Sequence, residues 1–522
     1  MTAHAKVAFL LLALAASPST KGQEPTEPAT EKPSPAAKAR EMLDAAGEAA
    51  GGVRPEIQTA ALLHIADNYQ LLDKKKAREF AGQAFTAAGS LPQDPVKNRE
   101  RMQAEVVQVL ADIDVPEAVA LLRQMQATAG DYDPRWPAID KIVQVLIQKK
   151  DFDAAIELVE GLGSTGFFSY TGARSIFKAL PADDPRRTTL FGSAMSAFGV
   201  RPHRSFVVFL RECWGDVPKQ MAESALNGFL REILDRKSAE EHSQTGVSFA
   251  TAKGTVSFDS REDSELFDVM HIVRAINPKR AEELLETRPG LRAWLEQYPK
   301  GTESLRAEGW FWTFTVMGDD KQAADRMKQQ GRAQALTETI ASSALNAVRE
   351  DPDKAISLAQ TIPTPARRAE ILGSIARSVA GKDPDKARGA LDKCITLLDE
   401  IKNPNDRVAA WDSVADAAHQ INDEKLTSRA IDRALADAAE LYKQEEDVEV
   451  PNVFLREYWP STQGYRRAIM RATAILGVDA EPLLLKIVDP ELNLFARIAM
   501  AQALLGRSQE RFPTFAPRKK RR

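Results

Sequence analysis

The sequence has few of the residues that usually carry chemistry. Its 522 residues include only two cysteines and six histidines. The histidines show no HExxH, HxH or paired Cys/His spacing, so no zinc site is expected. No G-x-S-x-G turn occurs, and Cys213 has no companion His-Asn motif, which argues against a serine or cysteine nucleophile. We therefore expect no catalytic residues, no metal ligands and no bound cofactor.

The two cysteines, Cys213 and Cys394, lie in segments that are predicted to be helical and are far apart in the chain. An exported protein could join them in one long-range disulfide. Cysteine is also among the residues most often buried as a free thiol. We expect two separately buried thiols, with the disulfide as the alternative.

One stretch has the pattern of a nucleotide-binding loop. Residues 161–166, GLGSTG, match G-x-G-x-x-G. That motif binds a pyrophosphate only where a strand precedes it and a helix follows. The preceding text, DFDAAIELVE, is helical instead, so the glycines are interpreted as the end of a helix and a turn.

The sequence also lacks an excess of charge of either sign. The formal net charge is -4, with 43% hydrophobic and 28% charged residues. No basic stripe with interleaved aromatics occurs, so nucleic-acid binding is not expected. The basic ending PRKKRR, within residues 511–522, is predicted to be a solvated tail.

Long apolar runs are absent beyond the first 22 residues. Residues 7–16 are apolar, Lys6 precedes them and small residues follow, which is typical of a secretory signal peptide at residues 1–22. No later run is long enough to span a bilayer, so no stable membrane anchor is expected. We predict an exported protein, periplasmic or extracellular, that is soluble after cleavage. Residues 23–37, rich in Pro, Glu and Thr, are predicted to be a disordered linker.

What the sequence does contain is a repeated helix start. The letters DPDKA occur at Asp351 and again at Asp383. An Asp or Asn followed by charged residues and then alanine also begins at several other positions, namely Asp73, Asp114, Asp151, Asn277 and Asp319. The acidic or amide side chain caps free backbone amides, and proline suits the first helical turn. The alanine then permits close approach of a neighbouring helix.

A second helical motif precedes these helix starts by about twelve residues. Its apolar residues recur at i, i+3, i+4 and i+7, as in Leu62, Ile65, Ala66, Tyr69; Leu372, Ile375, Ala376, Val379; and Trp411, Val414, Ala415, Ala418. Two antiparallel helices with tight turns fill the period of 32 to 41 residues. The sequence therefore predicts an all-α solenoid of antiparallel helix pairs.

The order large aromatic, Leu-Ala, Tyr, then Asp-x-x-x-Ala resembles the tetratricopeptide repeat, most closely at Trp411, at Ala415 and in the DFDAA run at Asp151. The repeats are degenerate, their period drifts, and HEAT-like pairs are the alternative. The resemblance covers residues 38 to about 440. It implies a curved array whose first helices line a wall that binds peptides or proteins.

Interruptions divide the array. N-terminal repeats are expected over residues 38–241 and C-terminal repeats over 265–442. Between them, residues 242–264 contain strand-like text and predict a small β-hairpin near 245–259. An acidic linker is expected over 443–464 and a helical cap over 465–510. The aromatic run 310–314 is predicted to be a buried helix within the array.

These features favour a non-catalytic scaffold that binds a protein or peptide of unspecified identity. If the resemblance holds, the positions that face the wall include Asp67, Arg377 and Asp416, with His419 one turn later. Two alternatives are an enzyme, for instance a glycan-active hydrolase with dispersed carboxylates, and a structural component of the cell envelope.

Overall fold

The computed structural model describes residues 33–91, 98–125, 133–163, 168–235, 245–251, 254–258, 260–307, 312–317, 336–446 and 459–507. The predicted signal peptide at 1–22, most of the linker at 23–37, Asp319 and the basic tail at 511–522 lie outside these residues. No described helix is both long and apolar enough to cross a membrane. Helices dominate the described chain, so the all-α class is confirmed.

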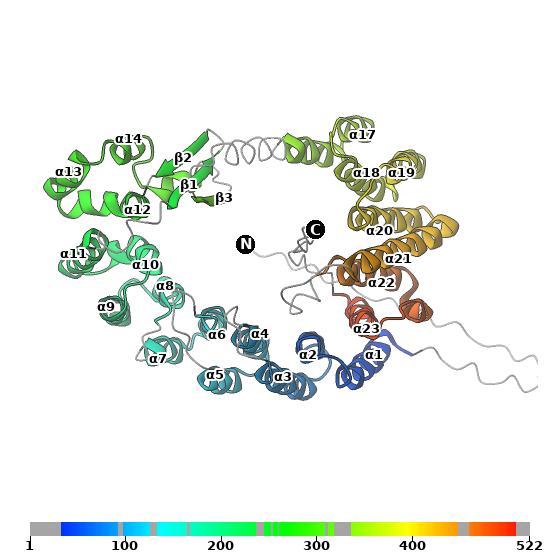
Figure 1. Cartoon of the computed structure of the whole chain (residues 1–522), viewed down its shortest axis with the longest axis horizontal. Helices are drawn as coiled ribbons and strands as arrows, with labels where there is room; N and C mark the ends of the chain where they lie inside the picture. The colour runs from blue at the N-terminus through cyan, green and yellow to red at the C-terminus, as the bar shows by residue number, and fades with distance from the viewer. Residues whose placement is uncertain are drawn as a thin grey trace, which may run out of the picture. The chain divides into compact units, whose positions relative to one another are not determined.

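The helices form consecutive antiparallel pairs, and the first and second members of a pair are called A and B helices here. In the N-terminal part, the A helices are α2 (Pro55–Tyr69), α4 (Asn98–Ile113), α6 (Trp136–Gln148), α8 (Tyr170–Ala179), α10 (Ser205–Cys213) and α12 (Arg261–Ile276). Their B partners are α3 (Lys74–Gly89), α5 (Val115–Gln124), α7 (Phe152–Gly163), α9 (Pro185–Val200), α11 (Lys219–Asp235) and α13 (Pro278–Glu286). Each A helix contacts the A helix of the next pair, which makes the array sequential (Figure 1).

The C-terminal part repeats this arrangement. Helix α17 (Pro352–Gln360) is the first B helix named in this part. The A helices α18 (Pro365–Val379), α20 (Pro404–Gln420) and α22 (Pro460–Leu476) follow, and the B helices α19 (Pro384–Leu398) and α21 (Glu424–Glu446) alternate with them. After α22 the 3-10 segment η4 (Gly477–Lys486) occupies the B position, because it contacts α22 as the other B helices contact their A partners. Helix α21 continues past residue 443, and α22 begins at Pro460, ahead of the expected cap at 465.

The predicted helix starts are correct wherever the chain is described. The side chains of Asp73, Asp114, Asn277, Asp351 and Asp383 each accept a hydrogen bond from a backbone amide in the first turn. Ala154 N donates to Asp151 Oδ1 at 3.3 Å in the same way. An N-cap of this kind contributes about 1 kcal/mol to a helix. The repeated Asp or Asn therefore fixes where these B helices begin.

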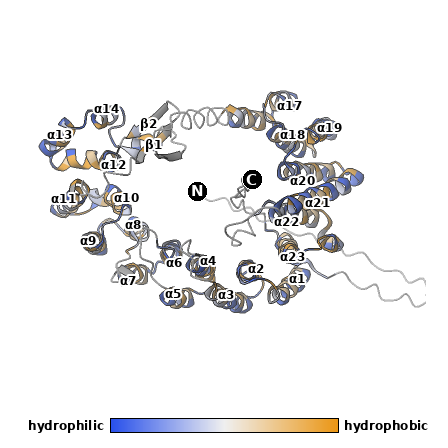
Figure 2. Cartoon of the chain, viewed as in Figure 1, coloured by the Kyte–Doolittle hydropathy of each residue, from blue (hydrophilic) through white to orange (hydrophobic). Residues whose placement is uncertain are grey.

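The apolar i, i+3, i+4, i+7 motif of the A helices forms the core. All of its members are buried, from Leu62 and Ile65 in α2 to Trp411 and Val414 in α20. Most helices carry one hydrophobic and one hydrophilic side (Figure 2), the pattern expected when one face packs against neighbours. Both cysteines are free and buried, Cys213 in α10 and Cys394 in α19, so the prediction of two separate thiols is confirmed.

A small sheet follows α11. Strand β1 (Thr245–Thr251) pairs antiparallel with β2 (Gly254–Phe258), with Phe249 opposite Val256, which confirms the predicted hairpin. A third strand, β3 (Trp312–Met317), pairs with the other edge of β1. The prediction of a buried helix across residues 310–314 is therefore wrong from Trp312 onward. The alternation W-T-F-T-V suits a strand. The partner of this strand is the free edge of β1, which is too far away in the sequence to be recognised from the residues around 310–314.

The sheet packs against the last N-terminal repeat. Phe258 of β2 lies 4.9 Å from Phe267 of α12 between ring centroids, and Phe249 contacts Phe258 edge to face. Trp294 Nε1, in α14 (Pro289–Gln297), donates to Ser257 O at 3.1 Å. Helix α15 (Thr302–Ala307) follows and also contacts α12. These contacts give the apolar face of the hairpin a partner within the helical array.

The two ends of the helical region contact each other. Helix α23 (Pro490–Leu504) packs against α22 on one side and against α1 (Pro35–Ala50) and α2 on the other (Figure 1). Helix α23 thus takes the A position and α1 the B position of one pair built from both ends of the chain. The Arg54 guanidinium binds the Glu491 carboxylate twice, at 2.8 and 2.6 Å.

Further ion pairs cross this junction. Lys38 Nζ lies 2.7 Å from Glu481 Oε2, and Arg507 pairs with Asp67. The Glu491 hydrogen bond is the main reason that the pKa of Arg54 is raised, because the charged form is the one it stabilises. Phe495 in α23 is 1% exposed and meets His64 of α2 edge to face. The last helix is therefore part of the core that covers the first two.

Replacement of Phe495 by alanine tests this junction. Loss of a buried phenylalanine costs about 3–5 kcal/mol, and here the cavity would open between α23, α1 and α2. We expect Phe495→Ala to raise deuterium uptake in Pro35–Ala50 and Pro55–Tyr69, more than 400 residues away in the chain, while α6 and α8 stay protected. Val488→Ala, at a side chain that is 92% exposed, is the matched control. Uptake changes confined to α22 and α23 would contradict the junction.

Candidate functional site

The site predicted from the sequence lies on the A helices, next to their buried seam. Ala66, Ala376 and Ala415 are at most 1% exposed because they face neighbouring helices. The following residue on a helix is turned by about 100°, which places it at the edge of the buried face. Asp67, Arg377 and Asp416 occupy these positions and are each partly exposed. All three take part in ion pairs within the chain.

Arg377 and Asp416 are brought together by the packing of α18 on α20. Arg377 Nη1 lies 3.4 Å from Asp416 Oδ2. Arg471 of α22 approaches from the other side, with Nη1 2.9 Å from Asp416 Oδ2 and Nε 2.9 Å from Asp412 Oδ1. These four residues, called the Asp416 network, join three consecutive A helices with two arginines and two carboxylates.

Electrostatics hold this network in its charged form. Burial by itself would lower the pKa of Arg471, but the hydrogen bond and charge of Asp412, together with Asp416, raise it overall. The side chains of Arg471, Asp412 and Asp416 are between 16% and 22% exposed. Ion pairs at this depth are screened less by salt than pairs at the surface. The network therefore presents fixed charges along the edge of the A helices.

Asp67 and His419 lie apart from the Asp416 network in their contacts. Asp67 accepts from Gln70 Nε2 at 3.1 Å and pairs with Arg507, which places it at the junction of the chain ends. His419 is exposed near the C-terminal end of α20, three residues after Asp416. Of the four predicted residues, the structure thus brings Arg377 and Asp416 into direct contact and leaves His419 on the adjacent exposed turn.

Sequence reasoning missed three members of these contacts, Asp412, Arg471 and Arg507. Asp412 lies one turn before Asp416, so helical spacing could have suggested it. Arg471 follows Asp416 by 55 residues and comes after an interruption of the repeat, so no spacing pointed to it. Arg507 lies 440 residues from Asp67, a pairing that only the junction of the ends creates.

A second charged group joins the A helices of the N-terminal part. Glu212 of α10 accepts from Arg174 Nη1 of α8 at 3.2 Å and also binds Lys178. Its neighbour Arg211 is 7% exposed and reaches Asp268 Oδ1 of α12 at 3.1 Å. Together these residues are called the Glu212 network.

The pKa of Glu212 lies below its usual value. Burial would raise this pKa, but the Lys178 hydrogen bond and the charges of Arg174, Lys178 and Arg211 together lower it. Nearby on α12, burial lowers the pKa of His271. Glu212 is consequently an ionised acceptor rather than a proton donor near neutral pH.

The carboxyls with a raised pKa lie outside the Asp416 and Glu212 networks. General acid catalysis needs a carboxyl whose pKa is raised toward the working pH and that sits beside a substrate. The carboxyls whose pKa burial raises, Asp140, Asp263 and Asp406, lie on α6, α12 and α20, which belong to different repeats. Among the described residues, no group of three or more His, Cys, Asp or Glu side chains is placed to hold a metal ion.

The thiol of Cys213 is equally unsuited to attack a substrate. Its side chain is fully buried, and burial raises its pKa to about 12. Since the thiolate is the nucleophilic form, almost none is present at neutral pH. The G-x-G-x-x-G stretch at 161–166 begins inside α7, so a helix precedes it as expected; residues 164–166 lie outside the described chain.

Comparisons with known proteins add little to this description. The sequence matches no protein-family profile and none of the curated proteins. One similar solved structure is that of a circular tandem repeat protein with novel repeat topology and enhanced subunit contact surfaces. The alignment covers 90% of this chain and 97% of the other chain, at 10% sequence identity and a TM-score of 0.19. At that TM-score the two backbones do not superpose, so the assignment of the fold depends on the helices and contacts of this chain itself.

Substitution of Arg471 measures what the Asp416 network contributes to stability. Arg471→Met keeps the length of the side chain but leaves Asp412 and Asp416 without this cation. We expect a loss of about 1–2 kcal/mol in the free energy of unfolding, since the pair is only partly exposed. Arg467→Met, one turn earlier in α22 at a residue with no ion pair in the described chain, should change it by less than about 0.5 kcal/mol. Equal losses in urea denaturation would show that the network contributes nothing.

Acid should weaken the Glu212 network in a defined direction. Because the folded protein lowers the pKa of Glu212 from 4.5, its contribution is present above pH 4.5 and is lost as pH falls through the lower folded value. We expect Glu212→Gln to be less stable than the parent at pH 7 and to lose less stability between pH 5 and pH 3. Thermal melts at several pH values measure this. Parallel curves for the two proteins would contradict the assignment.

Proposed function

We propose that this chain is an exported, tetratricopeptide-like scaffold that binds a peptide segment of another protein along its A helices, without catalysing a reaction. The observation that carries the proposal is the Asp416 network, which sets charged side chains in contact across three adjacent A helices. Fixed, partly exposed charges of both signs are suited to a peptide that offers both amides and charged side chains.

The spacing of the helices suits an extended ligand. Adjacent packed helices lie about 8–10 Å apart, and an extended chain advances about 3.3 Å per residue. A peptide that crosses α18, α20 and α22 would therefore meet a new A helix about every three residues. About eight to ten residues would cover the three helices, a length typical of a linear recognition motif. His419, on the exposed turn beside Asp416, would border this path.

Selection from a displayed library of random twelve-residue peptides tests the proposal on the full chain. We expect enriched peptides to protect α18, α20 and α22 from deuterium exchange. The double variant Arg377→Ala, His419→Ala should weaken their binding about tenfold, which is the size of two lost polar contacts at a partly exposed surface. Lys354→Ala with Lys393→Ala, on the B helices α17 and α19, is the control and should leave affinity unchanged.

Two outcomes would reject the proposal. One is that no peptide is enriched on the folded chain, and the other is that enriched peptides bind both double variants as tightly as the parent. Export has its own readout, because the mass of the chain recovered outside the cytoplasm should correspond to cleavage within or just after residues 1–22. An uncleaved chain that stays in the cytoplasm would remove that part of the proposal.

A further inference from the structure

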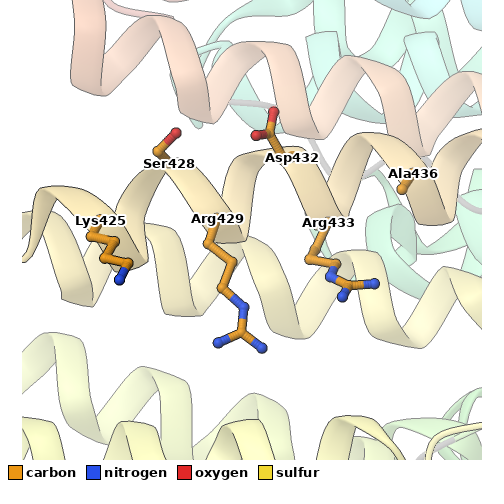
Figure 3. A pocket seen from close by; sticks show the side chains of 6 residues that line it. All are labelled: Lys425, Ser428, Arg429, Asp432, Arg433 and Ala436. Carbon is orange, nitrogen blue, oxygen red and sulfur yellow. The ribbon is translucent and has the colours of Figure 1, made fainter.

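The outward side of α21 carries a row of unpaired cations. Lys425, Arg429 and Arg433 follow one another at intervals of four residues, so they lie on one side of the helix, and all three are exposed. None of them has an ion pair anywhere in the described chain. Figure 3 shows the three side chains pointing to the same side of α21, while Ser428 and Asp432 point to the other.

Two earlier B helices show how such cations can be neutralised within the array. Arg78 of α3 pairs with Asp114 and Glu117 at the start of α5, at 2.6 and 3.2 Å. Lys386 of α19 likewise pairs with Asp353 of α17 at 2.8 Å. In each case the partner is a carboxylate on an adjacent B helix, so stacking of B helices supplies the counter-charge.

In the described chain no B helix follows α21, so a carboxylate could come only from the preceding B helix α19, and none of its carboxylates pairs with the three cations. The 3-10 segment η4 takes the place of the next B helix, and its contribution is a cation: Lys486 Nζ lies 2.7 Å from Asp432 Oδ1. Asp432, on the other side of α21 from the three cations, is thereby engaged by Lys486. The outward side of α21 is left with an excess of positive charge.

The three cations also line a shallow, open depression on α21. Lys425, Arg429 and Arg433 line a depression of about 680 Å³ together with Ser428, Asp432 and Ala436. On the adjoining segment Leu485 is 82% exposed, and Val488, two residues after Lys486, is 92% exposed. The segment that carries these two aliphatic side chains is joined to α21 by the ion pair of Lys486 with Asp432.

We propose that the basic row of α21, together with Leu485 and Val488 on the adjoining segment, docks an acidic amphipathic helix of a partner protein. Cations four residues apart on a helix advance by about 6 Å each, which matches carboxylates four residues apart on a facing helix. Aliphatic side chains of the same partner would cover Leu485 and Val488. The surface is separate from the A-helix path, so this inference does not require the proposed peptide to bind there.

A peptide probe tests the docking surface on the full chain. The probe is a fluorescein-labelled helical peptide of sixteen residues with glutamate at every fourth position and leucines along one edge. We expect Lys425→Gln, Arg429→Gln, Arg433→Gln together to weaken its binding about tenfold and to flatten its dependence on salt. The double variant Leu485→Ser, Val488→Ser should weaken it about threefold. Because all five side chains are exposed, melting temperatures should stay close to that of the parent.

A matched triple variant separates this surface from charge in general. Lys149→Gln, Lys219→Gln, Lys354→Gln removes three exposed cations elsewhere and should leave the affinity unchanged. Arg377→Ala with His419→Ala should also leave it unchanged, which distinguishes this surface from the A-helix path. The proposal is overturned if the probe does not bind, if both triple variants bind it equally, or if the chain binds phosphatidylglycerol vesicles through these cations but not the peptide.

Discussion

Close contact between helices at alanine is the constraint on which the rest of this structure depends. Ala66 and Ala376 in A helices and Ala77 and Ala387 in B helices are fully buried. A side chain this small lets two backbones approach, so that the larger Leu, Ile and Phe side chains around it interdigitate at the density of a protein interior. At Gly373 of α18 the approach is closer still, because a Cβ there would lie 2.6 Å from the Ser413 Cβ of α20. The charged networks exist because this spacing brings the edges of adjacent A helices within reach of an arginine.

The junction between α23 and α1 changes how such an array responds to stress. In an open array of repeats, each unit contacts only its neighbours, and the end units fray first. Here both end helices are covered, because α23 contacts α1 and α2 as well as α22. The bidentate pair of Arg54 with Glu491 and the buried ring of Phe495 hold this contact. Unfolding that begins at one end must therefore expose apolar surface at the other.

Local features of the fold could be predicted from the sequence. Capping by Asp73 or Asp383 depends on a few consecutive residues, and the i, i+3, i+4, i+7 pattern of the A helices depends on one helix, so both are readable in a short window. The strand at Trp312–Met317 was mistaken for a helix because its conformation depends on β1, more than sixty residues earlier. The position next to the buried alanine pointed to Arg377 and Asp416, and both are partly exposed in the structure. Their partner Arg471 could not be predicted, since it reaches them only through the stacking of three helices.

The pair that α23 forms with α1 also limits how this protein can change its length over evolutionary time. Repeat arrays commonly gain or lose whole units by duplication or deletion, because an extra unit only lengthens the stack. In this chain an added helix pair between α2 and α22 would carry the two end segments apart and uncover both at once. A change in the number of helix pairs would therefore need a compensating change in the curvature of the array to keep α23 against α1.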